Sequence, residues 1–325
     1  MNHFRTDLAI ELRENLSPQG DDIPGVEMTI EEDIDMGVRV TWVEITTEEG
    51  EAAMGKPKGN YITLESGAMK ENDTELHEDI AKILARKIGR LHSLGKEATI
   101  LVVGLGNRYV TPDALGPQVC EKMLVTRHLG DAVPEELTGR LRGVAALAPG
   151  VMGITGIETA EIVKGVVERT KPDLVIAIDA LAARRTSRVN ATIQISDTGI
   201  SPGAGLGNRR MAINEESMGV PVIAVGVPTV VDAATLVNDT MDQILSAMAE
   251  ATIDSQPFYN MLETMETSER YGIITEIMEP YASNMFVTPK EVDAVITRLA
   301  RIIANALNIA LHSGITLADV GRFLE

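Results

Sequence analysis

The sequence has few residues of the kinds that build disulfides and most metal sites. Cys120 is the single cysteine among 325 residues, so no intrachain disulfide can form, as is typical of a protein from a reducing compartment. Because Cys120 falls among the apolar residues of an expected helix, we expect a buried core thiol. The five histidines include no His-x-x-x-His pair, which disfavours both a zinc site on one helix face and a histidine-based triad.

Positive charge is also scarce, since 29 Lys and Arg residues face 48 Asp and Glu residues, for a formal net charge of −19. Such a charge is repelled by phosphate backbones and anionic membranes, and its simplest role is to keep the protein in solution. No apolar run reaches the length of a membrane span, and the N-terminus lacks the apolar stretch of a signal peptide. We therefore expect a cytoplasmic protein with no nucleic-acid or membrane partner.

What the chain does have is a repeated alternation of apolar strands and amphipathic helices. The pattern is plainest in residues 99–117, where the run TILVVG leads through a glycine turn into a helical pattern. This order predicts an α/β fold with a mostly parallel central sheet and helices on both faces. Further strands are expected at 144–147, 174–178, 189–195 and 221–227, and helices at 113–127, 157–170, 232–250 and 289–311.

The parts on either side of this core are less regular. Within residues 8–98, alternating apolar residues and then a helical spacing predict an additional N-terminal β layer followed by one helix. Residues 99–250 are expected to form the α/β core. Residues 251–325 are expected to hold an irregular, Met- and Glu-rich segment before the C-terminal helix. We expect all of residues 8–325 to form a single domain.

The glycine turn after the first core strand resembles a dinucleotide-binding loop. Gly104-Leu105-Gly106 follows a strand and precedes a helix, which is the right context for such a loop. However, Tyr109 occupies the third glycine position, where its side chain would prevent close packing of helix on strand. No acidic residue about 20 positions downstream completes the pattern. Nucleotide binding is therefore disfavoured.

Two aspartates fall at equivalent places in the expected sheet. Asp113 follows the turn after one buried strand, and Asp179 comes at the end of another. Neighbouring parallel strands would bring both carboxylates to the same sheet edge, where α/β proteins place their chemistry. Two close acids share a proton, so one can activate water while the other donates a proton. Each alone has a simpler explanation, as a helix N-terminal acid or a strand-end cap, and this alternative stays open.

Long stretches of the chain resemble the germination proteases of spore-forming bacteria, which degrade small acid-soluble spore proteins at germination. The resemblance covers most of the chain and is carried by VVGLGNRYVTPDALGP (102–117), PGVMGITGIET (149–159), DLVIAIDALAARR (173–185) and DTGISPGAGLGN (197–208). It implies an atypical aspartic peptidase with Asp113 and Asp179 as the catalytic pair. It also implies a fold related to the hydrogenase-maturation endopeptidases. In those relatives the corresponding acids bind nickel together with a histidine; no histidine here clearly completes such a site, so we expect no metal and no cofactor. A metal-dependent maturation endopeptidase is the alternative.

The resemblance also implies a zymogen that cleaves itself. Family substrates carry a motif similar to Thr-Glu-Phe-Ala-Ser-Glu that is cut after the first acid, and residues 6–11 read Thr-Asp-Leu-Ala-Ile-Glu. We therefore expect cleavage between Asp7 and Leu8, with residues 1–7 as a propeptide. The implied setting is the spore core, and the implied assembly is a homo-oligomer, a tetramer by resemblance.

Two further roles are expected around the aspartate pair. The turn that holds Gly106 and Asn107, or the glycine-rich loop 199–208, would supply backbone N–H donors to the oxyanion. Arg184 or Arg185 would pair with the acidic residue of the substrate, although either arginine would equally fit a solvated surface or a subunit contact.

Overall fold

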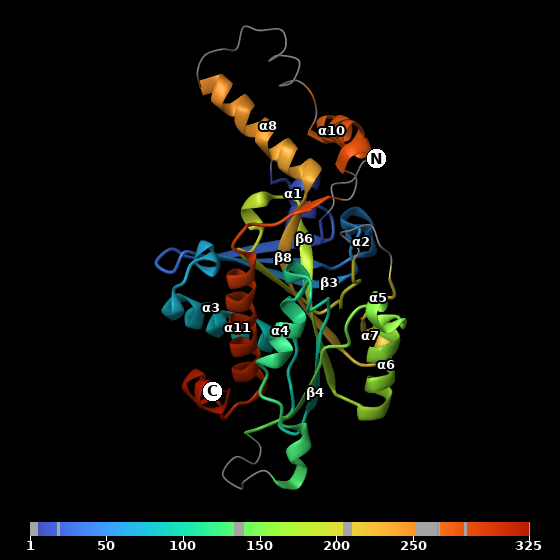
Figure 1. The fold of residues 1–325 in the computed structure, drawn as a ribbon, viewed down its shortest axis with the longest axis vertical. Helices are drawn as coiled ribbons and strands as arrows, with labels where there is room; N and C mark the ends of the chain where they lie inside the picture. Colours follow the sequence, from blue (N-terminus) through green and yellow to red (C-terminus); the bar gives the residue numbers. More distant parts are fainter. Residues whose placement is uncertain are drawn as a thin grey trace.

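A mixed β-sheet forms the centre of the computed structural model (Figure 1). The structure describes residues 6–17, 20–132, 140–203, 210–250, 265, 267–282 and 285–324. Within these residues nine strands pair in the order β1-β2-β3-β7-β8-β6-β4-β5, with β9 added to β8. The strands are β1 (Val26–Asp33), β2 (Val38–Ile45), β3 (Gly59–Glu65), β4 (Thr99–Gly104), β5 (Gly143–Leu147), β6 (Leu174–Ala183), β7 (Thr192–Ser196), β8 (Val222–Asp232) and β9 (Phe286–Val287).

Half of the sheet is parallel, as the alternation of strands and helices predicts. Strand β4 lies between β5 and β6, and β6 lies between β4 and β8, with parallel pairing at each of these three contacts. The register sets Gly104 of β4 beside Ile178 of β6. The strands are apolar on both sides because helices cover both faces.

The other half of the sheet is antiparallel, so the expectation of a mostly parallel sheet is wrong. Strand β7 runs antiparallel to β8 and to β3, and β3, β2 and β1 follow as an antiparallel meander. The N-terminal strands therefore extend the central sheet instead of forming an additional layer. The join between β3 and β7 links residues more than a hundred positions apart, so local patterns cannot reveal it.

Each face of the sheet carries an apolar cluster. On one face, alternate strand residues such as Ile100 and Val102 pack against the buried sides of α3, α4 and α11 (Figure 1). On the other face, Leu101 and Val103 pack with α6 and α7. The α-helices are α1 (Ala9–Leu16), α2 (Glu48–Met54), α3 (Thr74–Leu91), α4 (Leu115–Glu121), α5 (Met152–Thr155), α6 (Thr159–Thr170), α7 (Glu215–Met218), α8 (Ala233–Glu250), α10 (Thr267–Ala282), α11 (Val292–Leu311) and α12 (Leu317–Leu324).

Helix α11 is the one described helix with the length and apolar composition of a membrane span, which the sequence analysis did not anticipate. Most of this helix is buried inside the protein, where it packs against α3 and α4. Its long apolar stretch is accounted for by this core position.

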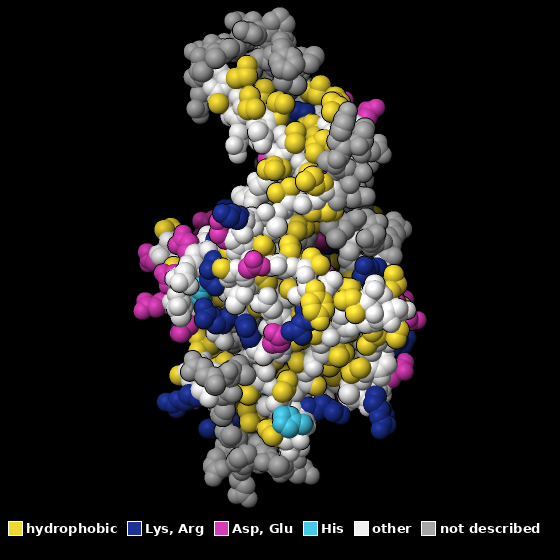
Figure 2. Space-filling model, in the orientation of Figure 1, with side chains coloured by type: hydrophobic (Ala, Val, Ile, Leu, Met, Phe, Trp, Pro, Cys, Tyr) yellow, Lys and Arg dark blue, Asp and Glu magenta, His cyan; other side chains and the backbone are white. Residues whose placement is uncertain are grey.

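Helices α8 and α10 project from the sheet and pack on each other through a small apolar cluster (Figure 1). Hydrophobic side chains also gather on the outside of this projection (Figure 2). Exposed apolar residues on the two helices are Leu236, Val237, Ile244, Ile273 and Ile277. Part of the segment expected to be irregular is thus the helix α10, and residues 251–264 lie outside the described part of the chain.

The core elements fall near their expected positions, with two differences that concern the candidate site. The expected helix 113–127 is shorter, because the 3-10 turn Thr111–Asp113 precedes α4, which ends at Glu121. Strand β6 continues to Ala183, so Asp179 lies inside the strand and not at its end. The parallel pairing with β4 nevertheless ends at Ile178, which leaves Asp179 just beyond it.

Candidate active site

Both predicted aspartates line one pocket of about 380 Å³ beyond the end of β4. The pocket thus confirms that Asp113 and Asp179 meet at one sheet edge. Its walls are Asp7, Leu105, Gly106, Val110, Pro112, Asp113, Val151, Thr159, Asp179, Ala180, Leu181, Ser201, Pro202, Gly203, Arg210, Thr229, Val230, Phe286 and Thr288.

The turn after β4 fixes Asp113. Gly106 has φ +108°, and a Cβ there would lie 2.1 Å from the backbone oxygen of Asp113, so only glycine fits. The backbone N–H of Asn107 donates a hydrogen bond to Oδ2 of Asp113 at 2.7 Å. The two predicted turn residues therefore hold the first carboxylate in place; whether they also contact an oxyanion stays a prediction.

Asp179 is held by the sheet itself. The residue is 6% exposed, and its Oδ1 accepts the backbone N–H of Ala180 at 2.9 Å. Its neighbours on β8 are also buried, so the carboxylate faces the pocket from a rigid strand. A site built on a strand keeps its geometry better than one built on a loop.

The electrostatics of the pocket favour one protonated carboxyl group. Burial raises the pKa of Asp179 well above its ordinary value, and the nearby charges of Asp113 and Asp7 raise it further. Burial also raises the pKa of Asp113, against the lowering effects of the Asn107 N–H and of Arg210. Two acids in such surroundings titrate as a pair, and the proton is retained more strongly on the more deeply buried Asp179.

The N-terminal segment runs into this pocket. The N–H of Asp7 donates to the carbonyl of Ala182 at 3.1 Å, and the N–H of Ala182 donates to Oδ2 of Asp7 at 2.9 Å. The side chain of Leu8 is completely buried in an apolar cluster with Leu181 and Val231. Residues 7 and 8, where the sequence predicts cleavage, are thus bound along β6 beside the aspartate pair.

The side chain of Gln194 on β7 forms hydrogen bonds with the same segment. Its side-chain N–H group donates to the carbonyl oxygen of Asp7 at 3.3 Å, and its Oε1 accepts the N–H of Ala9 at 2.7 Å. That carbonyl belongs to the peptide bond between Asp7 and Leu8. The amide of Gln194 therefore bridges the two sides of the predicted cleavage point.

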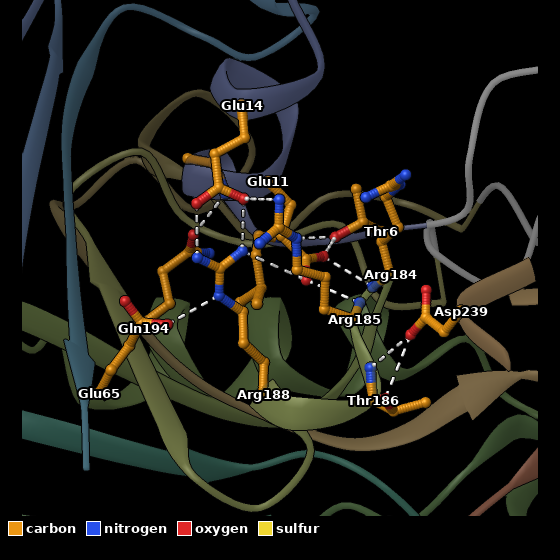
Figure 3. A network of polar contacts seen from close by, with 12 residues as sticks. Thr6, Glu11, Glu14, Glu65, Arg184, Arg185, Thr186, Arg188, Gln194 and Asp239 are labelled. Atoms are coloured by element: carbon orange, nitrogen blue, oxygen red, sulfur yellow. Dashed lines mark hydrogen bonds and ion pairs between the residues drawn. The ribbon is translucent and has the colours of Figure 1, made fainter. Parts of the chain in front are cut away.

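The two predicted arginines meet an acid of the N-terminal segment through their backbones (Figure 3). The N–H groups of Arg184 and Arg185 donate to the carboxylate of Glu11 at 2.7 and 2.9 Å. The Arg185 guanidinium lies 3.4 Å from Glu14. The guanidinium of Arg188, a residue not predicted from the sequence, lies 3.5 Å from the Glu11 carboxylate.

Other residues near the aspartate pair were missed because their roles depend on distant pairings. Arg210 lines the pocket from the chain after β7, whereas Gln194 of β7 binds the Asp7 carbonyl without lining that pocket. No local motif marks either residue. Ser201 also lines the pocket, in a Gly199–Gly203 stretch that matches the nucleophile pattern G-x-S-x-G. No histidine lines the described pocket to act as its base. Residues 204–208 of the predicted donor loop lie outside the described residues.

The described residues hold no group of three or more His, Cys, Asp or Glu side chains arranged to bind a metal ion. Two of the histidines are used elsewhere, because His77 and His312 contact the carbonyls of Ala68 and Leu124. The charged groups that line the pocket are therefore the carboxylates of three aspartates and the guanidinium of Arg210.

An α/β sheet that brings two carboxyl groups with raised pKa values into one pocket defines an enzyme-like site. Comparison with known proteins then gives the family. The sequence profile described as "Germination protease" matches residues 5–256 and 248–324. Curated proteins named germination protease from Caldanaerobacter subterraneus, Clostridium tetani and Bacillus subtilis are 52%, 49% and 43% identical. They cover 99%, 99% and 98% of this chain and 98%, 99% and 96% of their own lengths. The chain belongs to the germination protease family.

Proposed function

We propose that this protein is a self-processing endopeptidase zymogen that begins the degradation of small acid-soluble spore proteins at germination. Cleavage follows an acidic residue in motifs similar to Thr-Glu-Phe-Ala-Ser-Glu. The reaction is hydrolysis by water activated at Asp113 and Asp179. One observation carries the proposal: residues 6–11 of the chain, which resemble this motif, lie bound at the aspartate pocket with Asp7 in its wall.

The proposed chemistry follows from the unequal carboxyl groups. The ionised member of the pair takes a proton from water as the water oxygen adds to the carbonyl carbon. The protonated member then supplies a proton to the leaving amine as the C–N bond breaks. Burial and the neighbouring acids favour a retained proton on Asp179, which makes Asp113 the member that activates water.

Gln194 gives the reaction a donor for the developing oxyanion. Its N–H group already points at the Asp7 carbonyl, the group that would gain negative charge during attack. The neighbouring N–H of Ala9, on the other side of the bond, is held by the same side chain. Because Gln194 binds the chain on both sides of the bond to be cut, it restricts the conformation of the peptide there.

The proposed setting is the spore core, and the proposed assembly is a homo-oligomer, a tetramer by family resemblance. The exposed apolar side chains on α8 and α10 support an interface between copies, because large exposed apolar patches mark interaction surfaces.

The test compares the full-length precursor with its Asp113→Asn and Asp179→Asn variants. The N-terminal mass is followed by mass spectrometry, together with cleavage of a TEFASE peptide. The wild type is expected to lose Met1–Asp7 and to cut the peptide, and both variants are expected to do neither.

If either variant retains both activities, the aspartate mechanism is wrong. Wild-type activity that a chelator abolishes and one added metal restores would support a metal-dependent endopeptidase instead. A wild type with no proteolysis under any condition would overturn the proposed function.

A further inference from the structure

A buried carboxylate outside the aspartate pocket is unusually well bound. Glu11 is 0% exposed, and its two oxygens accept the backbone N–H groups of Arg184 and Arg185. The guanidinium of Arg188 lies 3.5 Å from the same carboxylate (Figure 3). Because burying a carboxylate is costly without such partners, these groups form a built site for an acid and not a chance surface contact.

The position of Glu11 relates this site to cleavage. Glu11 is the fourth residue after the Asp7–Leu8 bond, in the segment whose carbonyl and N–H groups Gln194 holds. Two hydrogen bonds join Asp7 to Ala182, and the carboxylate of Glu11, in the first turn of α1, is bound by the N–H groups of residues 184 and 185. One stretch of chain, 182–185, therefore contacts the segment at the cut and again four residues later.

We propose that the N–H groups of Arg184 and Arg185, with the guanidinium of Arg188, form a specificity site for an acidic side chain four residues after the cleaved bond of peptide substrates. The inference rests on the proposed function and names the part of the site that reads the substrate. In the precursor, Glu11 occupies this acid site.

Arg188 is held in place by residues outside the cleaved motif. Its Nε donates to Glu65 of β3 at 2.7 Å, and its two terminal nitrogens donate to Glu14 at 2.8 and 2.7 Å. Glu65 belongs to the sheet, so it keeps the guanidinium oriented when a substrate takes the place of the N-terminal segment. Charge-assisted bonds of this kind are the strongest basis for selecting a carboxylate.

The first experiment measures kcat/KM of the self-processed enzyme on two peptides that differ by Glu or Gln at the fourth position after the cut. The wild type is expected to prefer Glu by about 10- to 100-fold, the effect of bonds to a charged group. Arg188→Gln is expected to remove most of this preference. Arg39→Gln is the matched control and is expected to keep it, because Arg39 of β2 pairs with Glu32 and is not among the groups that bind Glu11.

A second experiment uses the precursor, which keeps the test valid if Arg188→Gln does not fold. Glu11→Gln removes the carboxylate at the fourth position, and the matched control Glu32→Gln removes a carboxylate that pairs with Arg39 of β2 away from the site. Self-cleavage is expected to slow about 10-fold or more in Glu11→Gln and to change little in Glu32→Gln.

Equal cleavage of both peptides by the wild type overturns the acid site and leaves the protease function standing. Equal rates of self-cleavage in the two precursor variants also overturn it. A wild type that cuts neither itself nor any peptide overturns the proposed function and this inference together.

Discussion

Replacing Asp179 with asparagine is expected to stabilise the fold while removing cleavage. Burial, with the charges of Asp113 and Asp7, raises the pKa of Asp179 well above its ordinary value. A carboxyl group with a raised pKa binds its proton more tightly in the folded state. Stability therefore falls as the pH rises from the unfolded pKa toward the folded pKa, and the penalty is complete above the folded pKa.

Asparagine removes that penalty and keeps the oxygen that accepts the Ala180 N–H. Removing a destabilised functional group typically adds about 1–2 kcal/mol to the free energy of unfolding. For a chain of this size we expect Tm to rise by about 2–4 °C near pH 8. Near pH 3, where the unfolded carboxyl group is also largely protonated, the gain should shrink toward zero.

Thermal unfolding at the two pH values, with self-cleavage followed by mass, tests this reasoning. Asp173→Asn is the matched control, since bonds from the Thr99 N–H and hydroxyl lower the pKa of Asp173. That stabilisation is present above the unfolded pKa and is lost as pH falls. The control should therefore lower Tm near pH 8 and keep cleavage. A lower Tm for Asp179→Asn near pH 8, or cleavage within about 10-fold of wild type, would refute the argument.

Other predictions concern the groups around the pair. Gly106→Ala should displace Asp113, cost about 1–3 kcal/mol in chemical denaturation and abolish peptide cleavage, whereas Gly153→Ala, with nothing near its Cβ, should do neither. Gln194→Ala should lower the rate of self-cleavage about 100-fold, and an unchanged rate by mass spectrometry would remove Gln194 from the mechanism. Burial raises the pKa of the Cys120 thiol to about 11, so a thiol reagent near pH 8 should label it far more slowly in the folded than in the denatured protein; equal rates would contradict this burial.

The aspartate pair could be predicted from the sequence because its evidence is local. Each aspartate comes after a run of apolar residues, and the rule that parallel strands end at one edge needs only that β4 and β6 are neighbours. The prediction that Asp179 ends its strand was wrong, because β6 continues to Ala183 along β8 after β4 has ended. That extension depends on a neighbour that the local pattern does not specify.

The rest of the site depends on long-range pairing. The join of β3 to β7 brings Glu65 beside Arg188 and aligns Gln194 with the N-terminal segment. An isolated glutamine on an apolar strand, or one arginine among three close together, carries no local sign of such a role. Backbone donors also leave no mark in the sequence, because the N–H groups that bind Glu11 would be present with almost any side chains at 184 and 185.

The docked N-terminal segment has a consequence for the proposed self-cleavage. The proposed cut would remove Asp7 and the residues before it, but the bonds from residues 184, 185 and 188 hold Glu11 and Glu14, on the part that would stay attached. The new N-terminus would then be a tethered product, present beside the site at an effective concentration on the order of millimolar. Every substrate would compete with it, so the affinity of the processed enzyme for peptides would depend in part on how easily its own first residues dissociate from the site.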